Sequence, residues 1–253
     1  MDVSLPTIAL LVVASFVAGT VDAIAGGGGL ITLPALLAAG LPPALALGTN
    51  KGQSVWGSGA ALLRFARAGL VDGRVARVTF PAGLLGSLGG AALVLLVPPT
   101  LLRPMVLGLL VVVAVVLTFR PATPAGPRPN AHRSLAVAAS IALVIGAYDG
   151  FFGPGTGTFL IFAFVIFFGA GMREASADAK VVNFASNLAA VALFASRGLV
   201  AWNVALPMAA GQFAGGLAGA HLAVRGGDRL VRWVVLLVVL ALVVKLGTDL
   251  ARG

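Results

Sequence analysis

Two lysines and two aspartates lie within apolar stretches of a chain in which only 10% of residues are charged. Lys51 lies in LGTNKGQS and Lys180 in ADAKVVNFASN, whereas Asp22 and Asp149 each precede a glycine-rich stretch by four residues. Ionisable side chains inside a membrane are costly and mark functional sites. The lysines would supply countercharge to an anion, and the aspartates would carry protons. The structural alternatives are a lysine that extends to the lipid headgroups and an aspartate that caps a helix.

The glycine-rich stretches, GGGG at 26–29 and GPGTG at 153–157, interrupt sequence that is otherwise apolar. Each glycine weakens a helix by roughly 1 kcal/mol relative to alanine, so both stretches predict a break in a helix. The helix that follows a break begins with free N–H groups and the positive end of its dipole, which together favour an anion. The alternative is tight packing of neighbouring helices through small residues.

Polar side chains near the breaks and the lysines would complete an anion site. Asn183 and Asn187 lie one helical turn apart on a shared face, where they would bind a ligand or hold a neighbouring helix. Asp22 and Asp149 are the candidates for proton coupling. The predicted substrate-binding residues are Gly26, Gly27, Gly28, Gly29, Thr49, Asn50, Lys51, Gly155, Thr156, Gly157, Lys180, Asn183 and Asn187.

Motifs of enzymes and metal sites are absent from the sequence. There is no G-x-S-x-G, no H-E-x-x-H and no Walker A motif, and the chain has no cysteine and only two histidines far apart. Disulfides and thiol chemistry are therefore excluded, and a histidine-rich metal site is not expected. The sequence predicts a protein that is not an enzyme and that needs no metal or cofactor.

The composition is that of an integral membrane protein. The chain is 59% hydrophobic, whereas soluble domains carry about 25% charged residues. Basic residues fall between apolar runs, so the net charge of +9 reflects membrane topology rather than nucleic-acid binding. Ten apolar segments are predicted, of which the second and seventh are short: 5–24, 30–39, 44–65, 75–97, 102–119, 135–148, 158–170, 177–196, 200–224 and 230–250.

The two halves of the chain resemble each other. Asp22 and Asp149 are 127 residues apart, and Lys51 and Lys180 are 129 apart. Five segments in each half would place the second half inverted in the membrane, and paired short segments in two halves point to a transporter site. The predicted divisions are a first repeat at 1–119, a cytoplasmic linker at 120–133 and a second repeat at 134–253.

Basic residues favour ten crossings with both termini outside. In that topology 12 of the 17 basic residues share one side, which is then the cytoplasm. The alternative, eight crossings with the second and seventh segments re-entrant, divides the charges more evenly. The twelve residues are Arg64, Arg67, Arg74, Arg77, Arg120, Arg128, Arg133, Arg173, Lys180, Arg225, Arg229 and Arg232.

The sequence resembles the TauE/SafE family of sulfite-exporter-like permeases over nearly its whole length. The first half carries Asp22, the four glycines, Pro34 and the run Gly48–Thr49–Asn50–Lys51, and the second half carries Asp149 and the GPGTG stretch. Gly211–Gln212 fits the family's closing pattern, whereas Pro154 stands where such a run more usually has glycine. The resemblance implies secondary transport of sulfur-containing anions such as sulfite or sulfonates.

The sequence therefore predicts an all-α integral membrane protein of two inverted repeats of five transmembrane helices, with short broken helices at its centre. We expect a multi-pass transporter of the cytoplasmic membrane that moves a small anion by alternating access. The expected partners are the anion, protons and the lipid bilayer. A passive anion channel is the alternative function, and no sequence feature specifies an oligomeric state.

Overall fold

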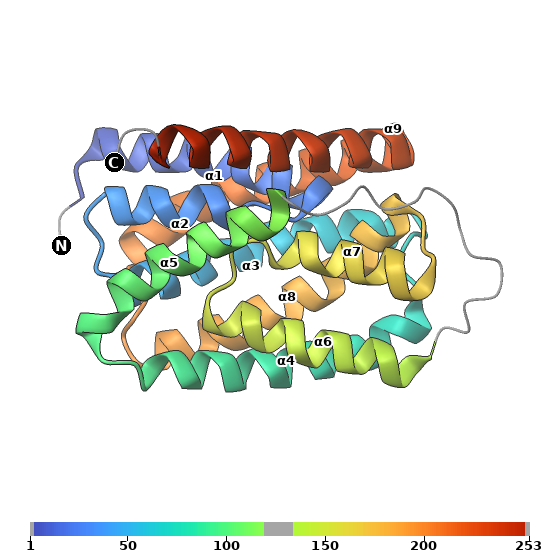
Figure 1. The fold of residues 1–253 in the computed structure, drawn as a ribbon, viewed down its shortest axis with the longest axis horizontal. Helices are drawn as coiled ribbons and strands as arrows, with labels where there is room; N and C mark the ends of the chain where they lie inside the picture. The colour runs from blue at the N-terminus through green and yellow to red at the C-terminus, as the bar shows by residue number, and fades with distance from the viewer. Residues whose placement is uncertain (1–2, 119–133, 251–253) are drawn as a thin grey trace.

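The fold was analysed in a computed structural model, which describes residues 3–118 and 134–250. The described residues form helices that run mostly along the long axis of the molecule (Figure 1), with no strand among them. The predicted all-α class is confirmed, whereas the predicted linker 120–133 lies outside the described residues. The helices are α1 Leu5–Ala25, α2 Gly29–Ala38, α3 Pro43–Arg67, α4 Gly73–Leu95, α5 Pro99–Thr118, α6 Leu135–Phe151, α7 Thr156–Phe168, α8 Met172–Ser196 and α9 Trp202–Leu250.

The two short helices follow the glycine stretches, as predicted. Helix α2 has 10 residues and α7 has 13, and each begins within two residues of the start that the sequence predicted. Gly26 ends α1 with a φ of 81°, and Gly155 precedes α7 with a φ of 83°. Such positive φ values suit glycine and stop a helix. In Figure 1, α2 and α7 begin near the middle of the molecule and run toward opposite ends.

Helix α9 contains the ninth and tenth predicted segments. Gly227, with a φ of 62° and a ψ of −165°, interrupts its helical backbone and separates residues 202–226 from residues 228–250. The predicted boundary at residues 225–229 is thus a glycine kink rather than a loop.

Helix α8 begins five residues earlier than predicted, at Met172. Its first turns contain the charged residues Glu174 and Asp178, so they do not belong to an apolar run and the predicted segment begins after Glu174. Carboxylates near a helix N-terminus are favourable, because they oppose the positive end of the helix dipole. Lys180 lies inside α8, as it does in the predicted segment 177–196, and it is buried there. Its inclusion among the twelve basic residues on the cytoplasmic side is therefore wrong.

Within residues 3–118 and 134–250, three helices are long and apolar enough to cross a membrane: α1, α4 and α8. The chain termini lie at one end of the molecule, and the α3–α4 and α7–α8 connections lie at the other (Figure 1). Helix α8 is the most buried of the three and runs through the core.

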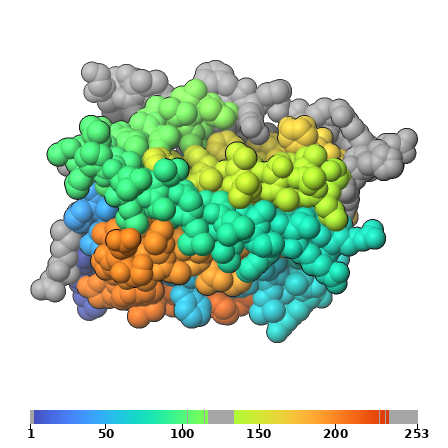
Figure 2. All heavy atoms as spheres, turned by 90° about the horizontal axis from the view of Figure 1, so that it is seen from below, coloured from blue at the N-terminus to red at the C-terminus, as the bar shows by residue number. Residues whose placement is uncertain are grey.

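Small residues let the long helices pack closely. On the face shown in Figure 2, α4 lies directly against α6. A Cβ atom at Gly90 would lie 1.9 Å from the carbonyl oxygen of Ala147 on α6, and one at Gly215 would lie 2.1 Å from that of Phe16 on α1. These glycines therefore serve helix packing, as membrane helices commonly require. Gly89, by contrast, has no atom within 4 Å of a Cβ position.

Candidate functional site

The two glycine breaks touch each other at the centre of the molecule. A Cβ atom at Gly26 would lie 2.1 Å from the carbonyl carbon of Gly157, and one at Gly157 would lie 2.5 Å from the Cα of Gly26. The hydroxyl of Thr158 donates to the carbonyl of Ala25 at 2.8 Å and ties the two breaks together. The first turns of α2 and α7 are adjacent to this contact, so glycine is required there by close approach as well as by backbone conformation.

Each buried lysine pairs with the aspartate of the other half of the chain. Lys51 Nζ on α3 lies 2.8 Å from Asp149 Oδ1 on α6, and Lys180 Nζ on α8 lies 2.8 Å from Asp22 Oδ2 on α1. Lys51 is 2% exposed and Lys180 is fully buried. The alternative that the lysines extend to the headgroups is therefore wrong for this structure.

The two aspartates have different second partners. Asp22 Oδ1 accepts a hydrogen bond from the backbone N–H of Gly28 at 3.3 Å, so Asp22 caps the start of α2 as well as pairing with Lys180. Asp149 Oδ2 accepts a hydrogen bond from the hydroxyl of Ser186 on α8. The side chain of Asp22 is 25% exposed and that of Asp149 is 5% exposed. Solvent therefore reaches one pair more readily than the other.

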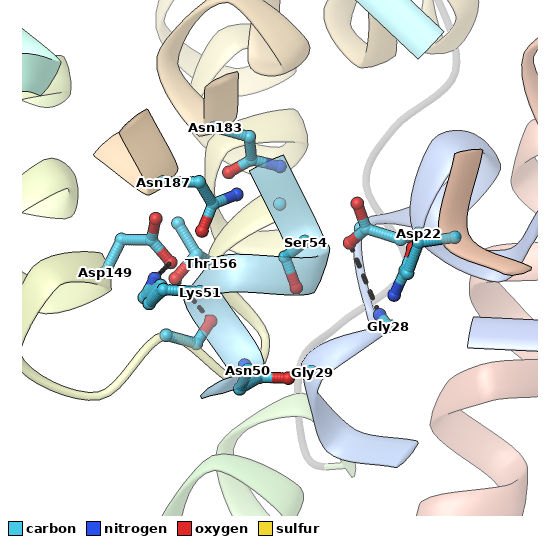
Figure 3. Close-up of a pocket in the computed structure, with 14 residues that line it drawn as sticks. Asp22, Gly28, Gly29, Asn50, Lys51, Ser54, Asp149, Thr156, Asn183 and Asn187 are labelled. Carbon is cyan, nitrogen blue, oxygen red and sulfur yellow. Dashed lines mark hydrogen bonds and ion pairs between the residues drawn. The ribbon is translucent and has the colours of Figure 1, made fainter. Parts of the chain in front are cut away.

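A cavity of about 30 Å³ lies between the two breaks and the ion pairs. Figure 3 shows Lys51 directed at Asp149, Asp22 beside Gly28, and Asn183 and Asn187 together on α8. This volume exceeds the roughly 10–15 Å³ that one ordered water molecule needs. The lining residues are Asp22, Gly26, Gly28, Gly29, Asn50, Lys51, Ser54, Asp149, Gly153, Thr156, Gly157, Asn183, Asn187 and Gln212.

Four of the predicted site residues do not line this cavity. Thr49 accepts a hydrogen bond from the backbone N–H of Ala201 at 3.0 Å, so its hydroxyl joins α3 to the start of α9. Gly155 is the residue before α7, Gly27 lies within the first break, and Lys180 is behind Asp22. Lys180 therefore supports an aspartate of the cavity rather than facing the cavity itself.

Three lining residues were missing from the predicted set: Ser54, Gly153 and Gln212. Ser54 follows Lys51 by three positions on α3, so helical periodicity alone could have identified it. Gly153 belongs to the second break. Gln212 comes from α9, and its signals in the sequence are its polarity within an apolar segment and its place in the family's closing pattern.

The amide groups of the cavity are partly engaged with neighbours. Asn50 Oδ1 accepts from the hydroxyl of Thr32 at 2.6 Å and from Nε2 of Gln53 at 3.0 Å. Asn187 Nδ2 donates to the hydroxyl of Ser58 at 3.5 Å, which is a long contact. Asn187 thus contacts α3, and both Asn183 and Asn187 border the cavity, so their binding of a ligand stays a prediction. No cluster of three metal-binding side chains was found among the described residues.

The family can be decided by comparison with known proteins. The model of the family described as sulfite exporter TauE/SafE matches residues 11–246. The chain belongs to the TauE/SafE family. The resemblance inferred from the glycine, lysine and aspartate pattern is therefore confirmed, and the glycine breaks and ion pairs lie within the matched region.

Relatives of this TauE/SafE chain are named as transporters. It is 38% identical over 251 residues to the probable membrane transporter protein ORF9 of Sinorhizobium sp, covering 98% of this chain and 95% of the relative. It is 38% identical to a probable membrane transporter protein of Haemophilus influenzae, with 98% of both chains covered. It is 36% identical to the probable membrane transporter protein YfcA of Escherichia coli K12, covering 93% and 87%. No solved structure gives a significant match.

These similarities establish the general function. The chain is a helical membrane protein with a role in membrane transport, and its family and relatives are named as transporters rather than enzymes.

Proposed function

We propose that this protein is a secondary transporter that moves a small anion, with sulfite or an organosulfonate as the expected substrate class, across the cytoplasmic membrane. The observation that carries the proposal is the convergence of two helix N-termini and the Lys51 ammonium on one central cavity. Both halves of the chain contribute to every wall of that site. A rocking motion of one half against the other would then open it to either side.

The chemistry of the cavity suits an oxyanion. Backbone groups at Gly28 and Gly29 start α2, and those at Thr156 and Gly157 start α7, so two positive dipole ends meet there. Sulfite and sulfonate groups present several oxygens that accept hydrogen bonds. The amides of Asn183 and Asn187 and the hydroxyl of Ser54 are the neighbouring side chains that would complete their coordination.

The narrowness of the cavity favours a transporter over a passive channel. A cavity of about 30 Å³ that the Lys51–Asp149 ion pair borders is not the continuous pore that a channel needs. We therefore expect the helices to move when a substrate passes. A flux that does not saturate with anion concentration would instead support the channel alternative.

Corresponding contacts support the inverted-repeat architecture. The backbone N–H of Asp72 donates to Asp178 Oδ1 at 2.9 Å, and that of Ala201 donates to the hydroxyl of Thr49 at 3.0 Å. The donors Asp72 and Ala201 are 129 residues apart in the sequence, and so are the acceptors Thr49 and Asp178. In the first bond the donor belongs to the first half of the chain, whereas in the second bond the donor belongs to the second half. Likewise, α6 packs on α4 as α1 packs on α9. Two halves with equivalent but exchanged contacts are what an inverted duplication produces.

The arrangement of the connections supports the predicted orientation, although α2 and α7 begin near the middle of the molecule rather than at one of its ends (Figure 1). Arg64 and Arg67 at the end of α3 and Arg74 and Arg77 at the start of α4 lie at the α3–α4 connection, at the end opposite the chain termini (Figure 1). We therefore assign this end to the cytoplasm and both termini to the outside.

Anion binding to the purified protein tests the proposal. Thermal shift in detergent would be measured with sulfite, sulfate, thiosulfate, sulfoacetate, chloride and a divalent cation. We expect a saturable shift with a sulfur oxyanion in the wild-type protein. The matched variant is the double substitution Lys51→Gln with Asp149→Asn, which removes both charges together and should abolish the shift. A shift with the cation alone would overturn the anion assignment.

A further inference from the structure

The charges around the cavity are already balanced in this structure. Asp22, Lys51 and Asp149 border the cavity, and Lys180 lies directly behind Asp22. Each ammonium group has a carboxylate oxygen at 2.8 Å. Among the described groups at the site, two positive and two negative charges therefore cancel.

An anion added to this neutral site would leave one negative charge uncompensated. An unpaired charge buried in protein within a membrane is strongly unfavourable. Gly153 lies close against this ion pair, since a Cβ atom there would lie 2.9 Å from Lys51 Nζ and 3.1 Å from Asp149 Oδ1. The backbone of the second break thus covers this ion pair. The Asp149 carboxylate occupies the position beside Lys51 that a bound anion would need.

We propose that Asp149 is the resident anion of the Lys51 site and that a monovalent substrate replaces it together with one proton. The proton binds Asp149 Oδ1, the oxygen that releases Lys51, while Oδ2 keeps its hydrogen bond from Ser186. The Lys51 ammonium then pairs with the substrate oxyanion. One negative charge enters with one proton, so the net charge of the site does not change. This inference rests on the anion-transport function proposed above.

The surroundings of Asp149 favour Asp149, rather than Asp22, as the carboxylate that takes up the proton and releases its lysine to the substrate. The groups around Asp149 are Lys51 from α3, Ser186 from α8 and Tyr148 on the same helix. Asp22 on α1 lies across the cavity, with Lys180 behind it. The nearest contact from α4 is uncharged, Ser87, whose carbonyl packs on Gly150, and α7 presents Thr156. Both members of the Lys51–Asp149 pair line the cavity, whereas Lys180 does not.

Asp22 also has a structural task that protonation would disturb. It caps α2 through the backbone N–H of Gly28 while it binds Lys180. The Asp22–Lys180 pair therefore holds α1, α2 and α8 together. The two pairs are equivalent in sequence position but differ in function.

Proton uptake on binding tests the inference. Purified protein in weakly buffered detergent solution would be mixed with methanesulfonate or thiosulfate, neither of which titrates near neutral pH, and the pH change would be recorded with an indicator dye. With methanesulfonate the wild-type protein should take up about one proton per bound anion. Its apparent Kd should rise about tenfold per pH unit in the range where Asp149 is ionised before binding.

The variant Asp149→Asn should bind methanesulfonate without proton uptake and with a Kd independent of pH, whereas Asp22→Asn should retain the uptake if it binds. Binding to the wild-type protein with no proton uptake and no pH dependence would overturn this inference but not the proposed function. If neither these anions nor sulfite, sulfate and sulfoacetate bind the wild-type protein at any pH, both are overturned. The wild-type measurement alone decides the matter should Asp149→Asn fail to fold.

Discussion

At the scale of single residues, the site is defined by exchange of partners between the halves of the chain. Lys51 could have paired with Asp22 of its own half, but it pairs with Asp149, and Lys180 pairs with Asp22. The aspartates and lysines therefore hold the halves together in this conformation. A conformational change that separates the halves must provide other partners for these charges, which is the role that substrate and proton would fill.

Removing one member of the Lys51–Asp149 pair should destabilise the fold more than removing both. Lys51→Gln leaves a carboxylate buried without its partner, which typically costs 3–5 kcal/mol. We expect a clear fall in the unfolding temperature in detergent for the single variant and a substantial recovery when Asp149→Asn is added. Equal unfolding temperatures for the single and double variants would mean that the pair does not interact as the structure shows.

Tyr148 connects the helix before the second break to the break itself. Its hydroxyl donates to the carbonyl of Pro154 at 2.6 Å, and its ring packs against Phe152 and Phe159. Tyr148→Phe keeps the ring contacts and removes only the hydrogen bond, so we expect a loss of about 1–3 kcal/mol in the free energy of unfolding. Denaturant titration of the purified variant measures it, and an unchanged midpoint would contradict the contact.

At the scale of elements, the short helices α2 and α7 exist because glycine interrupts what would be longer helices. The interruption also has a spatial function, since it lets one break lie against the other without side chains between them. Polar groups at the first turns of α2 and α7 are then buried at mid-molecule, where backbone outside a regular helix is tolerated because it lines a cavity.

Gly26→Ala should therefore disrupt the contact between the breaks. A positive φ costs a residue with a Cβ roughly 1–3 kcal/mol, and here the Cβ would also overlap the carbonyl carbon of Gly157 at 2.1 Å. We expect a marked loss of thermal stability and of anion binding. Gly89→Ala is the matched control, because that glycine is helical and exposed with open space around it. Similar losses in both variants would show that glycine content rather than this contact matters.

At the scale of the whole molecule, access to the site is unequal between the halves. Ser54 and Asn183 are equivalent positions 129 residues apart, and both line the cavity, but Ser54 is partly exposed whereas Asn183 is buried. Likewise, the side chain of Asp22 is more exposed than that of Asp149. Such unequal access is what one state of the proposed alternating-access cycle would show.

The absence of cysteine from the sequence makes this asymmetry measurable. We expect a membrane-impermeant thiol reagent to label Ser54→Cys faster than Asn183→Cys without substrate, and to reach the two cysteines from opposite sides of the membrane. The unsubstituted chain is the control for background labelling. Equal labelling of both cysteines from both sides at once would favour a channel and contradict alternating access.

Local sequence determined the membrane class, the helices and their breaks. Hydropathy and glycine content act over a few residues, so the starts of α2 and α7 could be predicted within two positions, and the pattern of conspicuous residues was enough to indicate the family. Ser54 could also be predicted as a residue of the site, because it shares a helical face with Lys51.

Only the tertiary structure decided which charges pair and which groups face the cavity. Lys180 and Asp22 are 158 positions apart, and nothing local to either residue specifies the other. Thr49 and Lys51 are two positions apart, yet the turn of the helix directs one to Ala201 and the other to Asp149. The site therefore depends on how the two halves of the chain pack against each other, because a charge buried in an apolar molecule must be matched by whatever group packing brings within bonding distance.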